Sequence, residues 1–262
     1  MRHFASSTVL LLLGQLTSSG QSLPITVTFS ADIVWAGVDR PGDLFVVLAT
    51  GEVQKIDKTG KRIGTHKFQA PPTLLDPLDG VQSFYYSRSD KRYGNLSYDF
   101  SNISENTLDP AFAIQPWLVC PALRELWILD SADYSIRKTA QNSLVILLEA
   151  ALQHLPKKKL SDYTYMREYQ NYVFLLDKQA GVHVFSPLGK FVKTMGEPNL
   201  SYFSFLGEEL YYVSGKDVVL IDLYTNEKRT IPAAADSRFV LLIDDRSYSV
   251  GLRSLSISAF KP

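Results

Sequence analysis

The chain has 262 residues, with 27 basic and 27 acidic side chains, 45% hydrophobic residues and 12% aromatic residues. A chain of this length can bury a large core, and its zero net charge excludes the strongly basic composition that is typical of proteins that bind nucleic acids or anionic membranes. We therefore expect a globular protein with no nucleic-acid partner, and the many Tyr, Phe, Val and Ile residues favour strands over helices.

Residues 1–20 have the features of a secretory signal peptide. A basic start is followed by the apolar run VLLLL at 9–13 and by small residues up to Gly20. This order is typical of a signal peptide that is cleaved after Gly20. The apolar run is too short to cross a bilayer, which takes about 20 residues, and no later run is long enough. We expect an exported protein that is not integral to a membrane; a buried N-terminal strand or helix is the alternative.

Two stretches of the chain share one layout of apolar runs, polar turns and a closing glycine. They are FVVLATGEVQKIDKTGKRI at 45–63 and FLLDKQAGVHVFSPLGKFV at 174–192. Each predicts a meander of three antiparallel strands. Gly60 aligns with Gly189, an offset of 129 residues or three repeats of 43. A period of about 43 residues with several strands per unit is typical of β-propeller blades.

Turn signals divide the rest of the chain into six groups of strands, one group per blade. Blade two is the least regular, with a polar, hairpin-like segment at 88–95 between its two strands. In blade three, the run 143–155 is either a strand or a short helix. The expected strands are 33–38, 44–48, 53–56 and 62–68 in blade one; 81–87 and 96–100 in blade two; 111–119, 126–129, 135–138 and 144–148 in blade three; 163–169, 172–176, 182–185 and 191–195 in blade four; 202–205, 210–213, 218–222 and 229–231 in blade five; and 239–243, 248–252 and 255–260 in blade six.

The strand at 25–29 stands before blade one and has no blade of its own, whereas blade six is one strand short. An open strand edge in the last blade would favour aggregation, and propellers avoid such edges by closing the ring. We therefore predict that 25–29 pairs with 255–260 as the outermost strand of blade six. The expected architecture is all-β: residues 21–262 form a single six-bladed β-propeller that is closed by its N-terminal strand.

Three blades repeat an apolar run, a turn, an apolar strand and a second turn. They read LWILDSADYSIRK from 126, FLLDKQAGVHVFSPLGKF from 174 and LYYVSGKDVVLIDLYTNEKR from 210. In this pattern the chain resembles the NHL and related six-bladed propellers, over about four of its six blades. The second strand of that family ends in Asp, matched here by Asp130 and Asp177, whereas Leu48 and Ser214 depart from it. The resemblance implies a fold and no activity, and we expect the two Asp side chains to bind the amides of the turn that follows.

Cys120 is the single cysteine, so no internal disulfide can form, and its position excludes a lipoprotein acyl site. Its apolar neighbours predict a buried side chain rather than a nucleophile. The histidines form no HExxH or HxH motif, and GxSxG, Walker A and GxGxxG motifs are absent. We therefore assign no catalytic residue, no metal ligand and no cofactor. His183 alternates with Val182 and Val184, which predicts a surface or inter-blade position.

Propeller lactonases hold a metal in the axial pore with Glu, Asn and Asp side chains from different blades. This chain has side chains of these types, which include Asp39, Asp79, Asn171 and Glu208. Scattered carboxylates occur on any surface, and the pairs Glu208-Glu209 and Asp244-Asp245 are more simply turn residues. A pore-centred, metal-dependent enzyme of the lactonase or lyase kind is therefore an alternative function.

Tyrosines recur in and beside the expected inner strands. We expect their rings to pack between blades while their hydroxyls reach polar partners. The other interpretation is a binding face at one end of the ring, since Tyr and Arg are typical anchors of protein contacts. The candidates for that face are Arg88, Arg92, Tyr93 and Arg167.

Together these features favour an exported, non-catalytic propeller that binds another envelope or secreted protein and acts as a scaffold. We expect a periplasmic or extracellular location without a lipid anchor, a monomer in the absence of its partner, and a role as an accessory of an outer-membrane or secretion assembly. The alternatives are the pore-centred enzyme and a carbohydrate or small-ligand receptor that uses exposed tyrosines.

Overall fold

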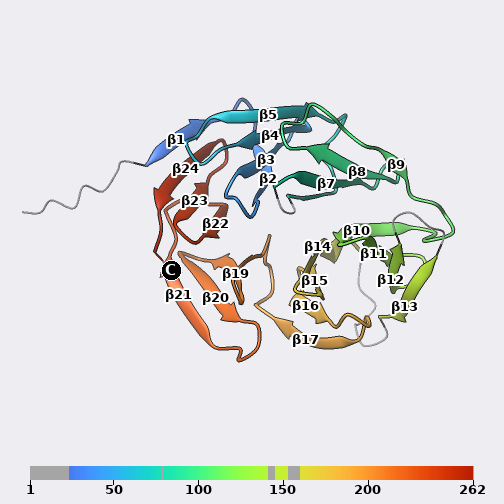
Figure 1. The fold of residues 1–262 in the computed structure, drawn as a ribbon. Helices are drawn as coiled ribbons and strands as arrows, with labels where there is room; N and C mark the ends of the chain where they lie inside the picture. Colours follow the sequence, from blue (N-terminus) through green and yellow to red (C-terminus); the bar gives the residue numbers. More distant parts are fainter. Residues whose placement is uncertain (1–23, 78–79, 141–144, 153–159, 262) are drawn as a thin grey trace, which may run out of the picture.

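The computed structural model of the chain contains six four-stranded antiparallel sheets arranged in a ring (Figure 1). It describes residues 24–77, 80–140, 145–152 and 160–261. The predicted all-β, six-bladed propeller is therefore confirmed, whereas the expected signal peptide at 1–20 lies outside the described residues. In the part of the chain that is described, no helix is long and apolar enough to span a bilayer.

Each of the first five blades is a meander of four strands that are consecutive in sequence. Blade one contains β2 (Ile33–Val38), β3 (Leu44–Leu48), β4 (Glu52–Ile56) and β5 (Arg62–Lys67), and blade two contains β6 (Leu74–Asp76), β7 (Gln82–Ser87), β8 (Arg92–Ser97) and β9 (Asn106–Thr107). Blade three contains β10 (Pro116–Ala122), β11 (Glu125–Asp130), β12 (Ser135–Ala140) and β13 (Ile146–Ala151), and blade four contains β14 (Tyr163–Tyr169), β15 (Tyr172–Asp177), β16 (Gly181–Phe185) and β17 (Phe191–Met195). Blade five contains β18 (Ser204–Leu206), β19 (Glu209–Ser214), β20 (Asp217–Asp222) and β21 (Lys228–Pro232), and blade six contains β22 (Phe239–Ile243), β23 (Arg246–Val250), β24 (Ser254–Ala259) and β1 (Ile25–Thr28).

The second strands are buried on both faces because each blade packs between two others. All five residues of β3 (LFVVL) are buried, as are five of the six residues of β15 (YVFLLD). The fourth strands lie on the outside of the ring, and β21 (KRTIP) is mostly exposed. Burial thus decreases from the second strand of a blade to the fourth. Because the second strands are buried on both faces, continuous apolar runs rather than strict alternation identified them in the sequence.

The N-terminal strand closes the ring as predicted. Strand β1 lies beside β24 (Figure 1) and pairs with it antiparallel, with Val27 opposite Leu255. Val27 also packs against the buried cluster that contains Leu255 and Ile257. The backbone N–H of Phe29 extends the pairing by donating to the carbonyl of Arg253 at 3.0 Å.

Blade two differs from the expectation in its third strand. That strand is β8, at Arg92–Ser97, and not 96–100; the turn before it is only 88–91. A Cβ at position 94 would lie 1.8 Å from the carbonyl oxygen of Ser104, so Gly94 is needed for close backbone packing. Because β8 contains polar residues and this glycine, its sequence lacks the apolar pattern that predicts a strand.

Blade three differs at both of its ends. Its inner strand is β10, at Pro116–Ala122 rather than 111–119, because residues 110–115 form a turn-rich segment. The leucine-rich run forms strand β13, with Arg137 opposite Glu149, so the helix alternative is wrong for the described part of 143–155. The run pairs its backbone with the edge of strand β12, and this pairing outweighs its helix propensity.

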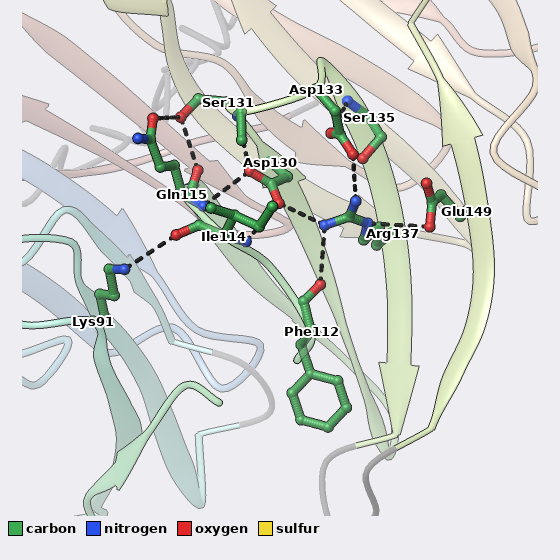
Figure 2. A network of polar contacts seen from close by, with 11 residues as sticks. Lys91, Phe112, Ile114, Gln115, Asp130, Ser131, Asp133, Ser135, Arg137 and Glu149 are labelled. Atoms are coloured by element: carbon green, nitrogen blue, oxygen red, sulfur yellow. Dashed lines mark hydrogen bonds and ion pairs between the residues drawn. The ribbon is translucent and has the colours of Figure 1, made fainter. Parts of the chain in front are cut away.

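The two aspartates of the NHL-like pattern have the expected structural role. Asp130 accepts hydrogen bonds from the amides of Ala132, Ile114 and Gln115 at 2.8–3.0 Å and forms an ion pair with Arg137 (Figure 2). The same guanidinium contacts Asp133, Glu149 and the carbonyl of Phe112, as the dashed lines of Figure 2 show. The network joins the loop before β10 to the β11–β12 turn.

Asp177 accepts the amide of Gln179 at 2.7 Å and contacts Nε2 of His183 at 3.0 Å. Nδ1 of His183 lies 2.8 Å from the hydroxyl of Thr194. His183 is only 4% exposed, so the surface alternative is wrong, whereas an inter-blade position stays a prediction. Its polar partners explain how an imidazole is tolerated there.

Tyrosine hydroxyls link neighbouring blades, as expected. Tyr86 of blade two donates to the carbonyl of Pro116 in blade three at 2.8 Å, and the amide of Leu242 in blade six donates to Tyr211 of blade five at 2.8 Å. The buried hydroxyl of Tyr163 is an exception, since it has no hydrogen-bond partner among the described residues.

Candidate functional site

A cavity of about 840 Å³ lies where the inner strands of all six blades end, and we call it the axial cavity. Its volume falls within the range of about 300–1,000 Å³ that is usual for ligand sites. Every blade contributes to its lining, and one representative from each blade, in order, is Asp39, Asp76, Leu123, Arg167, Phe205 and Asp244.

Arg167 and Asp76 form an ion pair within the axial cavity. Nε of Arg167, on β14 of blade four, lies 3.5 Å from Oδ2 of Asp76, on β6 of blade two. The pair thus joins two blades that are not neighbours in the ring. Burial by itself lowers the pKa of Arg167, but Asp76 and the nearby phenols outweigh this effect and raise it. The guanidinium is therefore charged at any physiological pH, and 18% of its side chain is exposed.

A second charged cluster adjoins the axial cavity beside blades one and two, where its Asp39 is part of the lining. Nζ of Lys55, whose side chain is 1% exposed, lies 3.3 Å from Oδ2 of both Asp39 and Asp43 and 3.3 Å from the carbonyl oxygen of Gly80. Burial raises the pKa of Asp39, although the amide of Asp43 and the ammonium of Lys55 partly oppose this rise. The other oxygen of Asp39 accepts the amides of Gly42 and Asp43. This cluster stabilises the turn after β2.

The part of the axial cavity's mouth that blades three to five form is apolar and aromatic. The rings of Tyr169 and Phe205 are stacked with their centroids 4.0 Å apart and an interplanar angle of 5°, and the hydroxyl of Tyr169 donates to the carbonyl of Gly207 at 2.6 Å. The guanidinium of Arg167 lies 5.9 Å from the centroid of Phe205. Leu123, in the turn after β10, also lines the cavity and is 97% exposed. A guanidinium, two stacked rings and an exposed leucine thus lie in one part of the lining.

The side chains that we considered as metal ligands of a pore-centred enzyme do not form a common site. Asp39 is held by Lys55 and two amides, whereas Asn171 and Glu208 lie in the turns after β14 and β18. Asp79 lies outside the described residues. Within the described ranges, no three His, Cys, Asp or Glu side chains are placed to hold a metal ion.

Glu168 is a further titratable group in the lining of the axial cavity. Burial raises its pKa, and its Oε1 accepts the amide of Asn171 at 2.7 Å. This carboxylate thus holds the turn after β14. The charges of Arg167, Asp76, Asp39 and Glu168 are therefore engaged with one another, with Lys55 or with the backbone.

The four predicted face residues occupy two different places. Arg88, Arg92 and Tyr93 lie at the β7–β8 hairpin, whereas Arg167 lies in the axial cavity. Arg88 stacks on the ring of Trp117 at 3.7 Å. Arg92 forms an exposed ion pair with Glu105 at 2.7 Å, and Tyr93 packs against Phe84 with centroids 6.1 Å apart. A binding role for the hairpin residues stays a prediction.

The sequence analysis missed Asp76, Lys55 and the partnership of Tyr169 with Phe205. The sequence does contain a pattern that indicates Asp76 as a site residue. Three inner strands end in Asp or are followed directly by Asp, namely Asp39, Asp76 and Asp244. Carboxylates at equivalent strand ends meet around the axis of a propeller. No local pattern indicated which cation faces which carboxylate.

No family model matches the sequence, and no curated protein matches it. The fold is similar to that of a protein of unknown function from Bacteroides thetaiotaomicron VPI-5482, with a TM-score of 0.65, 10% identity, and 92% of this chain and 76% of that chain covered. It is also similar to YCF48 bound to D1 peptide, with a TM-score of 0.53, 8% identity and coverage of 92% and 98%.

A third similar structure is PorZ of Porphyromonas gingivalis, described as an essential bacterial surface component of the type-IX secretion system. The TM-score is 0.50 and the identity 12%, and the match covers 91% of this chain but only 39% of PorZ. At such identities the likeness establishes the propeller fold alone. The resemblance to NHL propellers is not confirmed by these comparisons.

Proposed function

We propose that this chain is an exported, non-catalytic propeller that binds a segment of another envelope or secreted protein at the mouth of its axial cavity. The observation that carries the proposal is the grouping of Arg167, Tyr169, Phe205 and Leu123 around one opening. Arginine and aromatic side chains are the residues that most often dominate the binding energy of protein contacts.

The pairing of charges within the axial cavity also favours binding over catalysis. Asp76 faces Arg167, and Asp39 and Asp43 face Lys55, so these carboxylates are engaged with cations rather than directed at a reacting group. A partner segment can therefore contact the aromatic pair and the exposed part of Arg167 without leaving a buried charge unpaired.

The compartment follows from the expected signal peptide at 1–20. PorZ, which has a similar fold, is a surface component of a secretion system and supports this compartment. YCF48, also of similar fold, is bound to a peptide and supports the binding of a protein segment. We infer a comparable role for this chain as a scaffold in an outer-membrane or secretion assembly, as a monomer that becomes part of a complex through its partner.

Affinity capture from the native envelope tests the proposal, with mature protein (residues 21–262) as bait. Leu123→Asp is the main variant, because a side chain that is 97% exposed can be replaced without loss of core packing. We expect this variant and Arg167→Met each to bind the partner at least about tenfold more weakly than the unchanged protein. This factor corresponds to about 1.4 kcal/mol of binding free energy.

The matched control is Arg229→Met, which removes an arginine of blade five whose ion pair with Glu209 is on the outer side of the sheet. It should capture as much partner as the unchanged protein. Circular dichroism and thermal unfolding establish that each variant is folded. Equal capture by Leu123→Asp, Arg167→Met and the unchanged protein would show that the mouth of the axial cavity is not the contact surface.

A further inference from the structure

A smaller cavity, of about 370 Å³, lies between blades four and five, and we call it the seam pocket. Its buried wall consists of Phe174 on β15, Val184 on β16 and Met195 on β17, which are 2–4% exposed. The turn between β20 and β21 supplies the lining from blade five. The seam pocket shares no lining residue with the axial cavity, so it is a separate site.

Lys193 of β17 places its ammonium in the lining of the seam pocket. Nζ donates to the carbonyl oxygen of Leu223 at 2.6 Å and to Oδ1 of Asn226 at 2.7 Å, and both residues also line the pocket. These two acceptors are neutral, and Lys193 forms no ion pair with any residue that the structure describes. Since an ammonium has three N–H donors, one donor is left for a further acceptor.

The environment of Lys193 favours an anionic acceptor. Burial lowers the pKa of this lysine, which means that the charged form lacks full compensation within the chain. The carboxylate of Asp222 raises the pKa only in part, from beyond ion-pair distance. A carboxylate that reached Nζ would supply both the missing charge and the missing acceptor.

The rim of the seam pocket is formed by both blades. The hydroxyl of Tyr224, in blade five, donates to Oε1 of Gln170, in blade four, at 2.8 Å. Both residues are exposed, as is Val192, so the pocket can be reached from solvent at the side of the ring. The amide and hydroxyl can orient a ligand, while the apolar wall holds its hydrocarbon part.

We propose that the seam pocket binds an apolar group that carries a carboxylate. Phe174, Val184 and Met195 take the hydrocarbon part, and the free N–H of Lys193 takes the carboxylate. A volume of about 370 Å³ is at the small end of ligand sites and limits the group to a few carbon–carbon units or one ring. Two sources share this chemistry: a free aromatic or aliphatic acid, and the C-terminal residue of a polypeptide with an apolar side chain.

Three probes with one hydrocarbon body test the proposal by isothermal titration calorimetry on the folded mature protein. They are 4-phenylbutyrate, 4-phenylbutanol and 4-phenylbutylamine. We expect the acid to bind at least about tenfold more tightly than the alcohol and the amine. This comparison requires no variant and so does not depend on the folding of a mutant.

Lys193→Met should remove the preference for the acid and leave the weak binding of the alcohol unchanged. Lys190→Met, in the exposed turn before β17, is the matched control and should bind the acid as the unchanged protein does. Absence of binding of the acid at millimolar concentration, equal affinity for acid and alcohol, or an unchanged preference in Lys193→Met would each overturn the proposal.

The source is distinguished by the peptide acetyl-Gly-Gly-Gly-Phe with a free or an amidated C-terminus. Tighter binding of the free peptide than of 4-phenylbutyrate supports a polypeptide C-terminus, and the reverse order supports a free acid. These measurements use neither the partner nor the axial cavity, so their outcome is independent of the proposed scaffold function.

Discussion

Tyr202 and Val240 exchange two hydrogen bonds across the boundary between blades five and six. The phenol donates to the carbonyl oxygen of Val240 at 3.0 Å and accepts its amide at 2.6 Å. Tyr202 is 6% exposed and Val240 4% exposed, so water cannot readily replace either bond. The described blades share no strand pairing, so such hydroxyls are among the polar links that fix the position of one blade against the next.

Replacement of this phenol by phenylalanine should destabilise the ring without changing its shape. In Tyr202→Phe the carbonyl and the amide of Val240 stay buried and lose their partner, which costs about 1–3 kcal/mol. Urea unfolding followed by circular dichroism measures the loss. Tyr172→Phe is the control, since its hydroxyl makes no hydrogen bond with the described residues, and it should change stability by less than about 0.5 kcal/mol. Equal losses in both variants would contradict this role of the hydroxyl.

Asp130 should make the fold sensitive to acid. Burial by itself raises the pKa of this carboxyl, but three amides and Arg137 outweigh burial and hold the pKa below its ordinary value of 3.8. Because the folded-state pKa is the lower one, the stabilisation is fully present above the unfolded-state value and is lost as the pH falls through the two values.

Asp130→Asn should therefore lower the free energy of unfolding at pH 7 by about 1–3 kcal/mol. It should also lose less stability than the unchanged protein between pH 5 and pH 3, which urea unfolding at several pH values measures. Asp236→Asn, in an exposed turn, should change neither quantity. A parallel pH dependence of Asp130→Asn and the unchanged protein would exclude this carboxylate as the acid-sensitive group.

Lys55→Met should be among the most destabilising single substitutions in the chain. It removes the cation that faces Asp39 and Asp43 and leaves two carboxylates in a buried site, at a cost of about 3–5 kcal/mol. The pKa of Asp39 is already raised by burial, so its folded form binds a proton more tightly than its unfolded form. Stability then falls as the pH rises above 3.8, and the loss in Lys55→Met should be smaller at pH 4.5 than at pH 7.

Thermal unfolding at the two pH values measures this difference. Lys58→Met, an exposed lysine in the turn after β4, is the matched control and should behave as the unchanged protein at both. If Lys55→Met lost the same stability at both pH values, the cause would be altered packing rather than uncompensated carboxylates.

The architecture could be predicted because the strands buried on both faces, such as β3 and β15, appear as continuous apolar runs at blade spacing. Strand β8 could not, because its polar residues face outward and Gly94 is explained only by the backbone of Ser104. The role of Asp130 and Asp177 was predictable in part, because each accepts an amide of its own turn, from Ala132 and Gln179 respectively. Arg167 and Asp76 come from blades four and two, and a contact between non-neighbouring blades leaves no trace in a local pattern.

The closure of the ring by β1 can be tested with a designed disulfide. Thr26 and Ser256 lie directly opposite each other in the β1–β24 pairing, and neither is buried. Opposed positions have Cβ atoms about 4.5–5.5 Å apart, close to the separation that a disulfide needs. Thr26→Cys combined with Ser256→Cys should therefore form an intramolecular bond on mild oxidation, seen as faster migration in non-reducing electrophoresis.

The bond should also stabilise the ring, by up to about 5 kcal/mol on the chain-entropy estimate, because it joins segments from the two ends of the described chain. Cys120 should not compete, since it is fully buried and burial raises the pKa of its thiol well above the usual value. Thr26→Cys combined with Ser258→Cys is the control, because Ser258 lies opposite Ser247 and only diagonally from position 26. A bond in neither pair, or equally fast in both, would mean that β1 is not held in this register and that the ring is closed in another way.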